Sequence, residues 1–236
     1  MKKILLVAMA IMVNACSGVT SGGVQNKKSG ITPLYSVSKC SQVVVKSTYT
    51  ACYSYEHKGA TAVFYHLDGK LVGEGNIEQR PRFYEEQEIP EKYRSHYEDF
   101  YGHNIDRGHM RPDAATDWSW EKLRETYSLV NILPQYAVLN RKMWSKAERY
   151  ARYIAVKLGA VDVFNIAHYP DTAPVKIGRA SIDVPNRFYK IVYSKKHHFW
   201  RCFMYENLNY TAEEGAADSL ESHVIDCANI EWDNGK

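Results

Sequence analysis

The spacing of apolar residues predicts one long amphipathic helix in the middle of the chain. Between Asn140 and Leu158 apolar side chains recur every three or four residues, and Asn140 and Glu148 lie on the same stripe. Basic residues occupy the opposite face, and Gly159 stands where a helix commonly ends. Burying a carboxylate without partners is costly, so a glutamate on this stripe indicates a functional group.

The remaining pattern is that of strands, and together they predict an α+β fold in a single domain with a central antiparallel sheet. β-Branched and aromatic residues favour strands over residues 43–50, 51–55, 62–67, 70–72, 126–133, 161–167, 188–193 and 199–205. Asp68-Gly69 predicts a tight turn, and Pro134 is expected to end the strand before it. Residues 82–94 are expected to form a loop with a short helix, and residues 194–198 a hairpin tip.

The first residues resemble an export signal. Two lysines precede an apolar run from Ile4 to Val13, which is too short to span a bilayer as a helix. The run ends at Val13-Asn14-Ala15-Cys16, which resembles the site where bacterial lipoproteins are cut and lipidated on cysteine. We therefore predict a signal peptide over 1–15, a flexible tether over 16–35 and a folded domain over 36–236. The protein is expected to be exported and anchored through Cys16 to a membrane, facing the periplasm or cell surface. The alternative is an ordinary secretory signal.

The cysteines fit an exported protein. Once Cys16 is assigned to lipid, an even number remains, as expected where disulfides form. Cys40–Cys52 and Cys202–Cys227 would each close a short local loop, so this pairing is predicted. No cysteine or histidine spacing resembles a zinc site.

Net charge limits the kind of partner. The chain has 30 lysine and arginine residues against 27 aspartate and glutamate residues, which gives a formal net charge of +3. A protein so close to neutral can hold nucleic acid only through a local basic patch. Arginines gather between Arg80 and Arg152, which is compatible with such a patch.

Two linked motifs carry the candidate chemistry. The first is Asp106-Arg107-Gly108-His109, and the second runs from Asn131-Ile132-Leu133-Pro134-Gln135 to Asn140, Trp144, Glu148 and Arg152. His109 can accept a proton near neutral pH, and Asn140 offers a neutral oxygen that suits Mg²⁺. Arg80, Arg107 and Arg152 could grip phosphate oxygens. These residue types are those of a metal-assisted phosphodiesterase.

From about Asn76 to Tyr205 these motifs resemble the DNA/RNA non-specific endonucleases of the ββα-metal type. The resemblance implies a ββα-metal core, His109 as general base, and Asn140 as ligand of Mg²⁺, with Mn²⁺ as a substitute. It makes Glu148 the support of a metal-bound water, and Asn131 and Arg152 active-site polar residues. The family's upstream arginine falls on Arg80 or Arg82. The resemblance also implies DNA and RNA as substrates, cut without sequence specificity to leave 5′-phosphate ends; no protein partner is implied.

Three alternatives remain beside this interpretation. A surface lipoprotein of the same fold could bind nucleic acid without cleaving it. A different metal hydrolase could use His103, His109 and His168, although their spacing gives no support, and His197-His198 could bind a metal rather than form an exposed hairpin tip. Arg111 departs from the family, which usually has a small residue there. It is expected either to add a phosphate contact or to pair with Asp113 or Asp117 on the surface.

Overall fold

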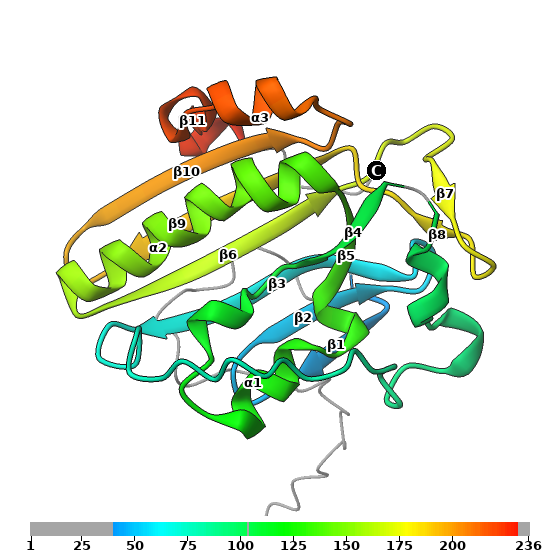
Figure 1. The fold of residues 1–236 in the computed structure, drawn as a ribbon, viewed down its shortest axis with the longest axis horizontal. Helices are drawn as coiled ribbons and strands as arrows, with labels where there is room; N and C mark the ends of the chain where they lie inside the picture. The colour runs from blue at the N-terminus through cyan, green and yellow to red at the C-terminus, as the bar shows by residue number, and fades with distance from the viewer. Residues whose placement is uncertain (1–39, 103, 231–236) are drawn as a thin grey trace, which may run out of the picture.

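The computed structural model describes residues 40–102 and 104–230. The predicted signal peptide, the tether, Cys16 and His103 lie outside these residues. The described chain forms a seven-stranded antiparallel sheet in the order β1-β2-β3-β6-β9-β10-β11 (Figure 1). Its strands are β1 Gln42–Val45, β2 Thr50–Ser54, β3 Gly59–Asp68, β6 Ala160–His168, β9 Arg187–Ser194, β10 Phe199–Glu206 and β11 Val224–Ile225. The predicted α+β class with a central antiparallel sheet is confirmed.

The predicted central helix covers one face of this sheet. It consists of a π-helical turn, η6 (Leu139–Trp144), followed by α2 (Ser145–Leu158), and Gly159 ends it with φ +86°. The buried stripe of α2 packs against β3, β6 and β9, and Figure 1 shows the helix crossing in front of the sheet. The Trp144 ring lies 5.7 Å from that of Phe188 and 5.5 Å from that of Tyr205, between centroids. The helix therefore buries its apolar side as the spacing predicts.

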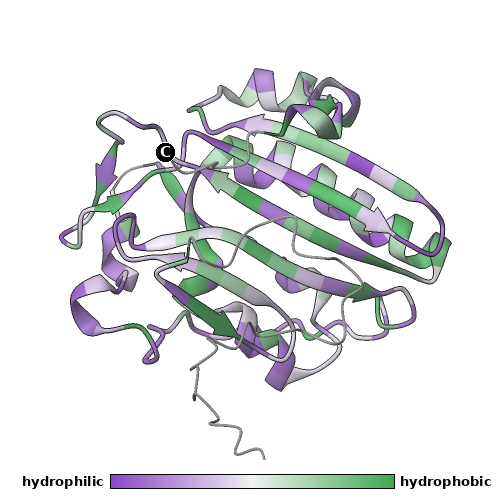
Figure 2. Ribbon diagram, turned by 180° about the vertical axis from the view of Figure 1, so that it is seen from behind, coloured by the Kyte–Doolittle hydropathy of each residue, from purple (hydrophilic) through white to green (hydrophobic). Residues whose placement is uncertain are grey.

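The opposite face of the sheet carries a second apolar cluster. Figure 2 shows this face from behind, with hydrophobic and hydrophilic positions alternating along the strands and no helix of the described chain across it. Phe164, Ile166, Tyr189 and Ile191 form the centre of the cluster, and Ile230 packs there too. The strands that carry this cluster are rich in β-branched and aromatic residues, which made them recognisable from the sequence.

The remaining elements are short. A second sheet pairs β4 (Ile105–His109) with β5 (Ile132–Tyr136), and a third pairs β7 (Lys176–Ile177) with β8 (Ile182–Asp183). The helices are α1 Trp120–Thr126 and α3 Ala212–Ala217, and the 3₁₀ turns are η2 Glu91–Tyr93, η3 Tyr97–Phe100, η4 Asp113–Ala115, η5 Leu129–Asn131, η7 Leu220–His223 and η8 Cys227–Asn229. Among the described residues no helix is both long and apolar enough to cross a membrane.

Three strand predictions are wrong in detail. The run 43–50 is divided into β1 and β2 by a turn in which the Lys46 amide donates to the Tyr49 carbonyl at 2.8 Å. Residues 70–72 form a turn after β3, not a strand. The run 126–133 ends α1 and forms η5, and the strand begins only at Ile132 and continues through Pro134. A proline is tolerated there because a two-stranded sheet leaves its nitrogen on an edge.

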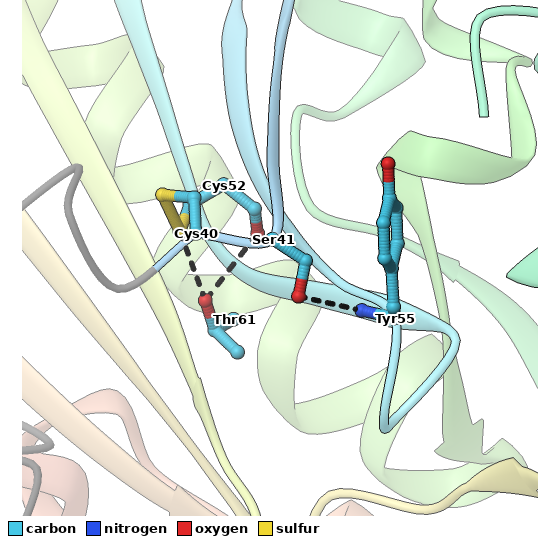
Figure 3. Close-up of a disulfide and its surroundings, with 5 residues drawn as sticks. All are labelled: Cys40, Ser41, Cys52, Tyr55 and Thr61. Carbon is cyan, nitrogen blue, oxygen red and sulfur yellow. Dashed lines mark hydrogen bonds between the residues drawn. A yellow bond between two sulfur atoms is a disulfide. The ribbon is translucent and has the colours of Figure 1, made fainter. Parts of the chain in front are cut away.

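Both predicted disulfides, Cys40–Cys52 and Cys202–Cys227, are present. Figure 3 shows Cys40 bonded to Cys52 of β2, with the Thr61 hydroxyl of β3 donating to the Cys52 carbonyl at 3.3 Å. Beside it, the Ser41 hydroxyl accepts a hydrogen bond from the Tyr55 amide at 3.0 Å. The bond therefore fastens the first described residue to β2, the second strand of the sheet.

Candidate active site

Strand β4 presents Arg107 and His109 on one face, because alternate residues of a strand point the same way. Between them, Gly108 faces Gln135 of β5. A Cβ at Gly108 would lie 2.3 Å from the Gln135 side chain, which is fully buried. Glycine is therefore required for the two strands to approach closely enough to place His109.

His109 lies in a largely aromatic setting. Its ring centroid is 4.9 Å from that of Tyr127 and 5.6 Å from that of Phe83, and its Nε2 is buried without a hydrogen bond among the described residues. Burial lowers the pKa of His109; Asp113 raises it and Arg80 lowers it further. The imidazole is therefore neutral at physiological pH, which is the form that accepts a proton.

Acidic and basic groups border this ring. The Tyr127 hydroxyl donates to Asp113 at 2.8 Å, and Arg80 lies 3.4 Å from the carboxylates of both Asp113 and Asp117. Arg82 is exposed, and no ion pair links it to the other described residues. Of the two candidate arginines, Arg80 is thus the one beside His109.

Asn140 lies in the π-helical turn that opens the long helix, and such turns are frequent at functional sites. Its Nδ2 donates to the Asp106 carboxylate of β4 at 2.9 Å. Arg141 holds the same carboxylate through two hydrogen bonds, at 2.8 and 2.6 Å. Because the amide nitrogen is engaged, the Oδ1 atom of Asn140 is left as the end that can bind a cation. The sequence had given Asp106 and Arg141 no role, since only the fold brings them together.

Glu148 and Arg152 are half-buried and flank the buried stripe of α2, which consists of Ala147, Ala151 and Ala155. Burial raises the pKa of Glu148, while Lys190 and Arg152 oppose this shift. Arg152 has a buried Nη1 with no hydrogen bond among the described residues. A buried N–H group without an acceptor is costly, so this Nη1 atom is available to an anionic ligand.

Lys190 is a component that the sequence did not indicate. It lies on β9 with 0% exposure, its Nζ donates to Asn165 at 2.9 Å, and it stands 4.1 Å from the Trp144 ring centroid. Asn165 in turn donates to the Met110 carbonyl, directly after His109. Burial lowers the pKa of Lys190, whereas Glu148 raises it. Lys190 is therefore linked through Asn165 to the backbone after His109, and it interacts electrostatically with Glu148.

The side chains of Asn131 and Arg107 both make contacts with other residues of the protein. The Asn131 side chain is fully buried, accepts from the Arg111 amide at 2.8 Å and donates to the Arg111 and Thr126 carbonyls, each at 2.9 Å. Arg107 donates to the Tyr97 carbonyl at 2.7 Å and lies 3.8 Å from that ring's centroid. Asn131 thus anchors the chain after His109, and Arg107 is packed in an aromatic setting.

Arg111 does not form the predicted surface pair with Asp113 or Asp117, while its predicted phosphate contact stays a prediction. It is only 4% exposed, and the two aspartates proposed as its surface partners lie beside Arg80 instead. The Arg111 side chain points away from these acids, toward the Tyr65 ring.

The other histidine alternatives gain no support. His168 bonds to Asn186 at 2.8 Å, and His197 at its hairpin tip bonds to the Leu158 carbonyl at 3.0 Å. Among the described residues, no three His, Cys, Asp or Glu side chains converge in a way that could hold a metal ion.

The site thus combines a neutral histidine in an aromatic setting, an asparagine with a fixed amide, a half-buried glutamate and two arginines. These are the groups that a phosphodiester-cleaving enzyme needs. The chain belongs to the DNA/RNA non-specific endonuclease family, whose model matches residues 27–235.

Known relatives agree with this assignment. Bovine mitochondrial endonuclease G is 26% identical over 234 residues, covering 97% of this chain and 72% of that protein. The mitochondrial nuclease of Saccharomyces cerevisiae is 28% identical over 160 residues, covering 62% of this chain and 49% of its own length. The fold is similar to the crystal structure of the EndoG/EndoGI complex, with a TM-score of 0.68 and 22% identity over 78% of this chain and 80% of that one.

Proposed function

We propose that this protein is a Mg²⁺-dependent endonuclease that hydrolyses DNA and RNA without sequence specificity. The observation that carries the proposal is the hydrogen bond from Asn140 to Asp106. This bond ties the long helix to strand β4, which carries His109 three residues after Asp106. It also engages the Nδ2 atom of Asn140 and leaves its Oδ1 atom free. A proton acceptor and a cation ligand are thereby held in one rigid unit.

His109 acts as the general base. Because its pKa is lowered, it is unprotonated at neutral pH and takes a proton from the attacking water. Arg80 and Arg152 neutralise the phosphate as negative charge develops, and the buried Nη1 of Arg152 gains a partner in doing so.

The residues present fit Mg²⁺. Asn140 would hold the ion through Oδ1, with water and substrate phosphate completing its shell, as Mg²⁺ usually prefers. When bound, the ion would stabilise charge on the phosphate and on the departing oxygen. Glu148, on the same helix as Asn140, supports the metal-binding region, and Lys190 favours the charged form of Glu148.

Among the described residues, we assign no group to reading bases. The residues that we assign to substrate are arginines, which grip phosphate rather than base edges, and phosphate contacts carry no sequence information. The substrate would therefore be any accessible nucleic-acid strand. We also propose that the chain is an exported lipoprotein, anchored through lipid on Cys16.

The test is to incubate purified protein with supercoiled plasmid and with RNA, in Mg²⁺ or in chelator. Wild type should degrade both substrates only with the metal. His109→Ala should lower the rate about 10²–10⁴-fold, the usual cost of losing a general base. His197→Ala, a histidine change at an exposed hairpin tip, is the matched control and should leave the rate unchanged.

Two outcomes would contradict the proposal. Cleavage at a single defined sequence would exclude a non-specific enzyme. Binding of DNA with no cleavage in Mg²⁺ or Mn²⁺ would favour the inactive surface lipoprotein instead.

A further inference from the structure

A pocket of about 610 Å³ lies beside the catalytic groups and is not used by them. It opens between the β1–β2 turn, the end of β3 and the segment that leads into α1. Figure 1 shows α1 below the long helix α2. The lining of the pocket combines aromatic and cationic residues, among them Tyr49, Tyr65, Trp118, Lys46, Arg111 and Lys122. Such a lining suits an anion with a planar apolar body.

Arg111 supplies a buried positive charge to this pocket. Its Nε donates to the Thr116 hydroxyl at 3.1 Å and its Nη1 to the His66 carbonyl at 3.2 Å, while the guanidinium lies 4.9 Å from the Tyr65 ring centroid. Within the described part of the chain, Nη2 donates no hydrogen bond and no carboxylate oxygen lies within 4.0 Å of the guanidinium. Glu125 favours the charged form only from a longer distance.

This lack of a counter-ion is unusual for a guanidinium so deeply buried. Burial lowers the pKa of Arg111 to about 10, so its charge is held at a cost to the protein. An anion in the pocket would remove that cost and would occupy the unused Nη2.

The other cations of the lining already have partners. Lys46 lies 2.7 Å from Glu86 and 3.0 Å from Glu88. Lys122 lies near two glutamates of α1, and His66 bonds to Asp162 at 2.8 Å. Arg111 is therefore the cation in the described lining that an incoming anion would neutralise.

We propose that this pocket binds the phosphate group of a nucleotide, with Arg111 as its anchor. Arginine is the side chain best matched to phosphate, because its planar fork donates two parallel hydrogen bonds. Trp118 of the lining offers apolar surface on which a base can stack. The ligand class is therefore a nucleoside monophosphate or the phosphorylated end of a strand.

The position of the pocket gives this binding a use that rests on the proposed nuclease function. One short segment, residues 109–118, serves both sites. His109 and Asp113 lie toward the catalytic groups, whereas Arg111, Ala115 and Trp118 face the pocket. A cut strand carrying a terminal phosphate would thus find a second phosphate site across the wall from the base, where it could be held after cleavage.

The experiment measures binding by titration calorimetry in chelator, so that neither catalysis nor a metal is needed. The probes are thymidine 5′-monophosphate, thymidine and inorganic phosphate. We expect the monophosphate to bind more tightly than phosphate, and thymidine not to bind measurably. Arg111→Met should weaken monophosphate binding about tenfold or more, as expected for the loss of a charge-assisted contact. Arg111→Lys should restore part of it.

Two further variants locate the site and guard against misfolding. Arg152→Met, on the catalytic side, should leave monophosphate binding in chelator unchanged, and Arg149→Met is a matched control on the exposed face of α2. Leu71 lines the pocket and is 38% exposed, so Leu71→Glu can bring a negative charge to it without disturbing the core. This change should weaken binding even if Arg111→Met fails to fold.

Three results would overturn the inference. Binding that is lost in Arg152→Met but kept in Arg111→Met would place the phosphate in the catalytic site. Equal affinity for thymidine and thymidine monophosphate would show that the phosphate group is not recognised. Equal affinity for inorganic phosphate and the monophosphate would show that the nucleoside is not recognised. Plasmid cleavage, measured separately, tests the proposed function alone, so failure of one proposal is distinguishable from failure of the other.

Discussion

Replacing Lys190 with methionine should separate the activity of this protein from its stability. The lysine is fully buried on β9, bonded to Asn165 at 2.9 Å and placed 4.1 Å from the Trp144 ring centroid. Methionine is of similar length and fills the same space without a charge. The substitution therefore tests the ammonium group rather than the packing.

The stability terms for Lys190→Met oppose one another. Leaving the Asn165 oxygen buried without its donor costs about 1–3 kcal/mol, and the lost cation–π contact about 2 kcal/mol. Against this, a buried ammonium carries a desolvation penalty of several kcal/mol, which the variant no longer has. We expect the free energy of unfolding to change by no more than about 2 kcal/mol.

The catalytic consequence of Lys190→Met should be larger. Lys190 is the strongest group opposing the burial-driven rise in the pKa of Glu148. Without it, that pKa rises further, and the carboxylate forms only at higher pH. Because the ionised form is the one assigned to the site, the acid limb of kcat/KM should move upward by about one pH unit or more. On that limb a shift of one unit lowers activity tenfold at fixed pH.

The assay is kcat/KM on a DNA duplex in Mg²⁺ across pH, paired with thermal unfolding of the same samples. Lys195→Met, at the exposed hairpin tip, is the matched control and should keep both the wild-type profile and the wild-type Tm. An unshifted acid limb in Lys190→Met would refute the electrostatic role. A uniform loss of rate with a lowered Tm would mean that Lys190 is only structural.

Three further outcomes are expected. Asp106→Ala frees the Asn140 amide, so half-maximal activity should need about tenfold more Mg²⁺, and an unchanged metal titration would exclude Asn140 as the ligand. Gly108→Ala forces a Cβ against the Gln135 side chain, so activity should fall well before the sheet unfolds, as measured by rate and circular dichroism. Cys16→Ser should abolish lipid labelling and release the protein from membranes; wild-type protein that is already soluble and unlipidated would disprove the anchor.

The long helix and most of the strands could be predicted because their signals are local. Spacing of three and four residues marked the stripe of α2, and β-branched and aromatic residues marked β6, β9 and β10. Pro134 misled the prediction because a proline is excluded only from strands paired on both sides. The turn at 46–49 was missed because two strands and their connection share one β-branched composition.

The sequence named the residues of the candidate site, but it could not give their partners in the structure. Asp106 and Arg141 are 35 residues apart, and Lys190 and Asn165 are 25 apart, so no periodicity links them. The pattern around Lys190 is that of a buried strand, in which a lysine would ordinarily be placed on an exposed face. Only the pairing of β6 with β9 in the sheet shows that Asn165 lies opposite Lys190 and can accept its hydrogen bond.

The buried polar side chains of this site share one task, which explains why they are tolerated. Strand β4 ends at His109, so the backbone groups of Met110 and Arg111 leave the ladder inside the protein and need other partners. Asn165 takes the Met110 carbonyl, while Asn131 takes both the amide and the carbonyl of Arg111. The base is therefore held at the end of a strand by a fully bonded backbone, with its imidazole free to meet substrate. The same segment turns the Arg111 side chain away from the base, which allows two phosphate sites to be built from one stretch of chain.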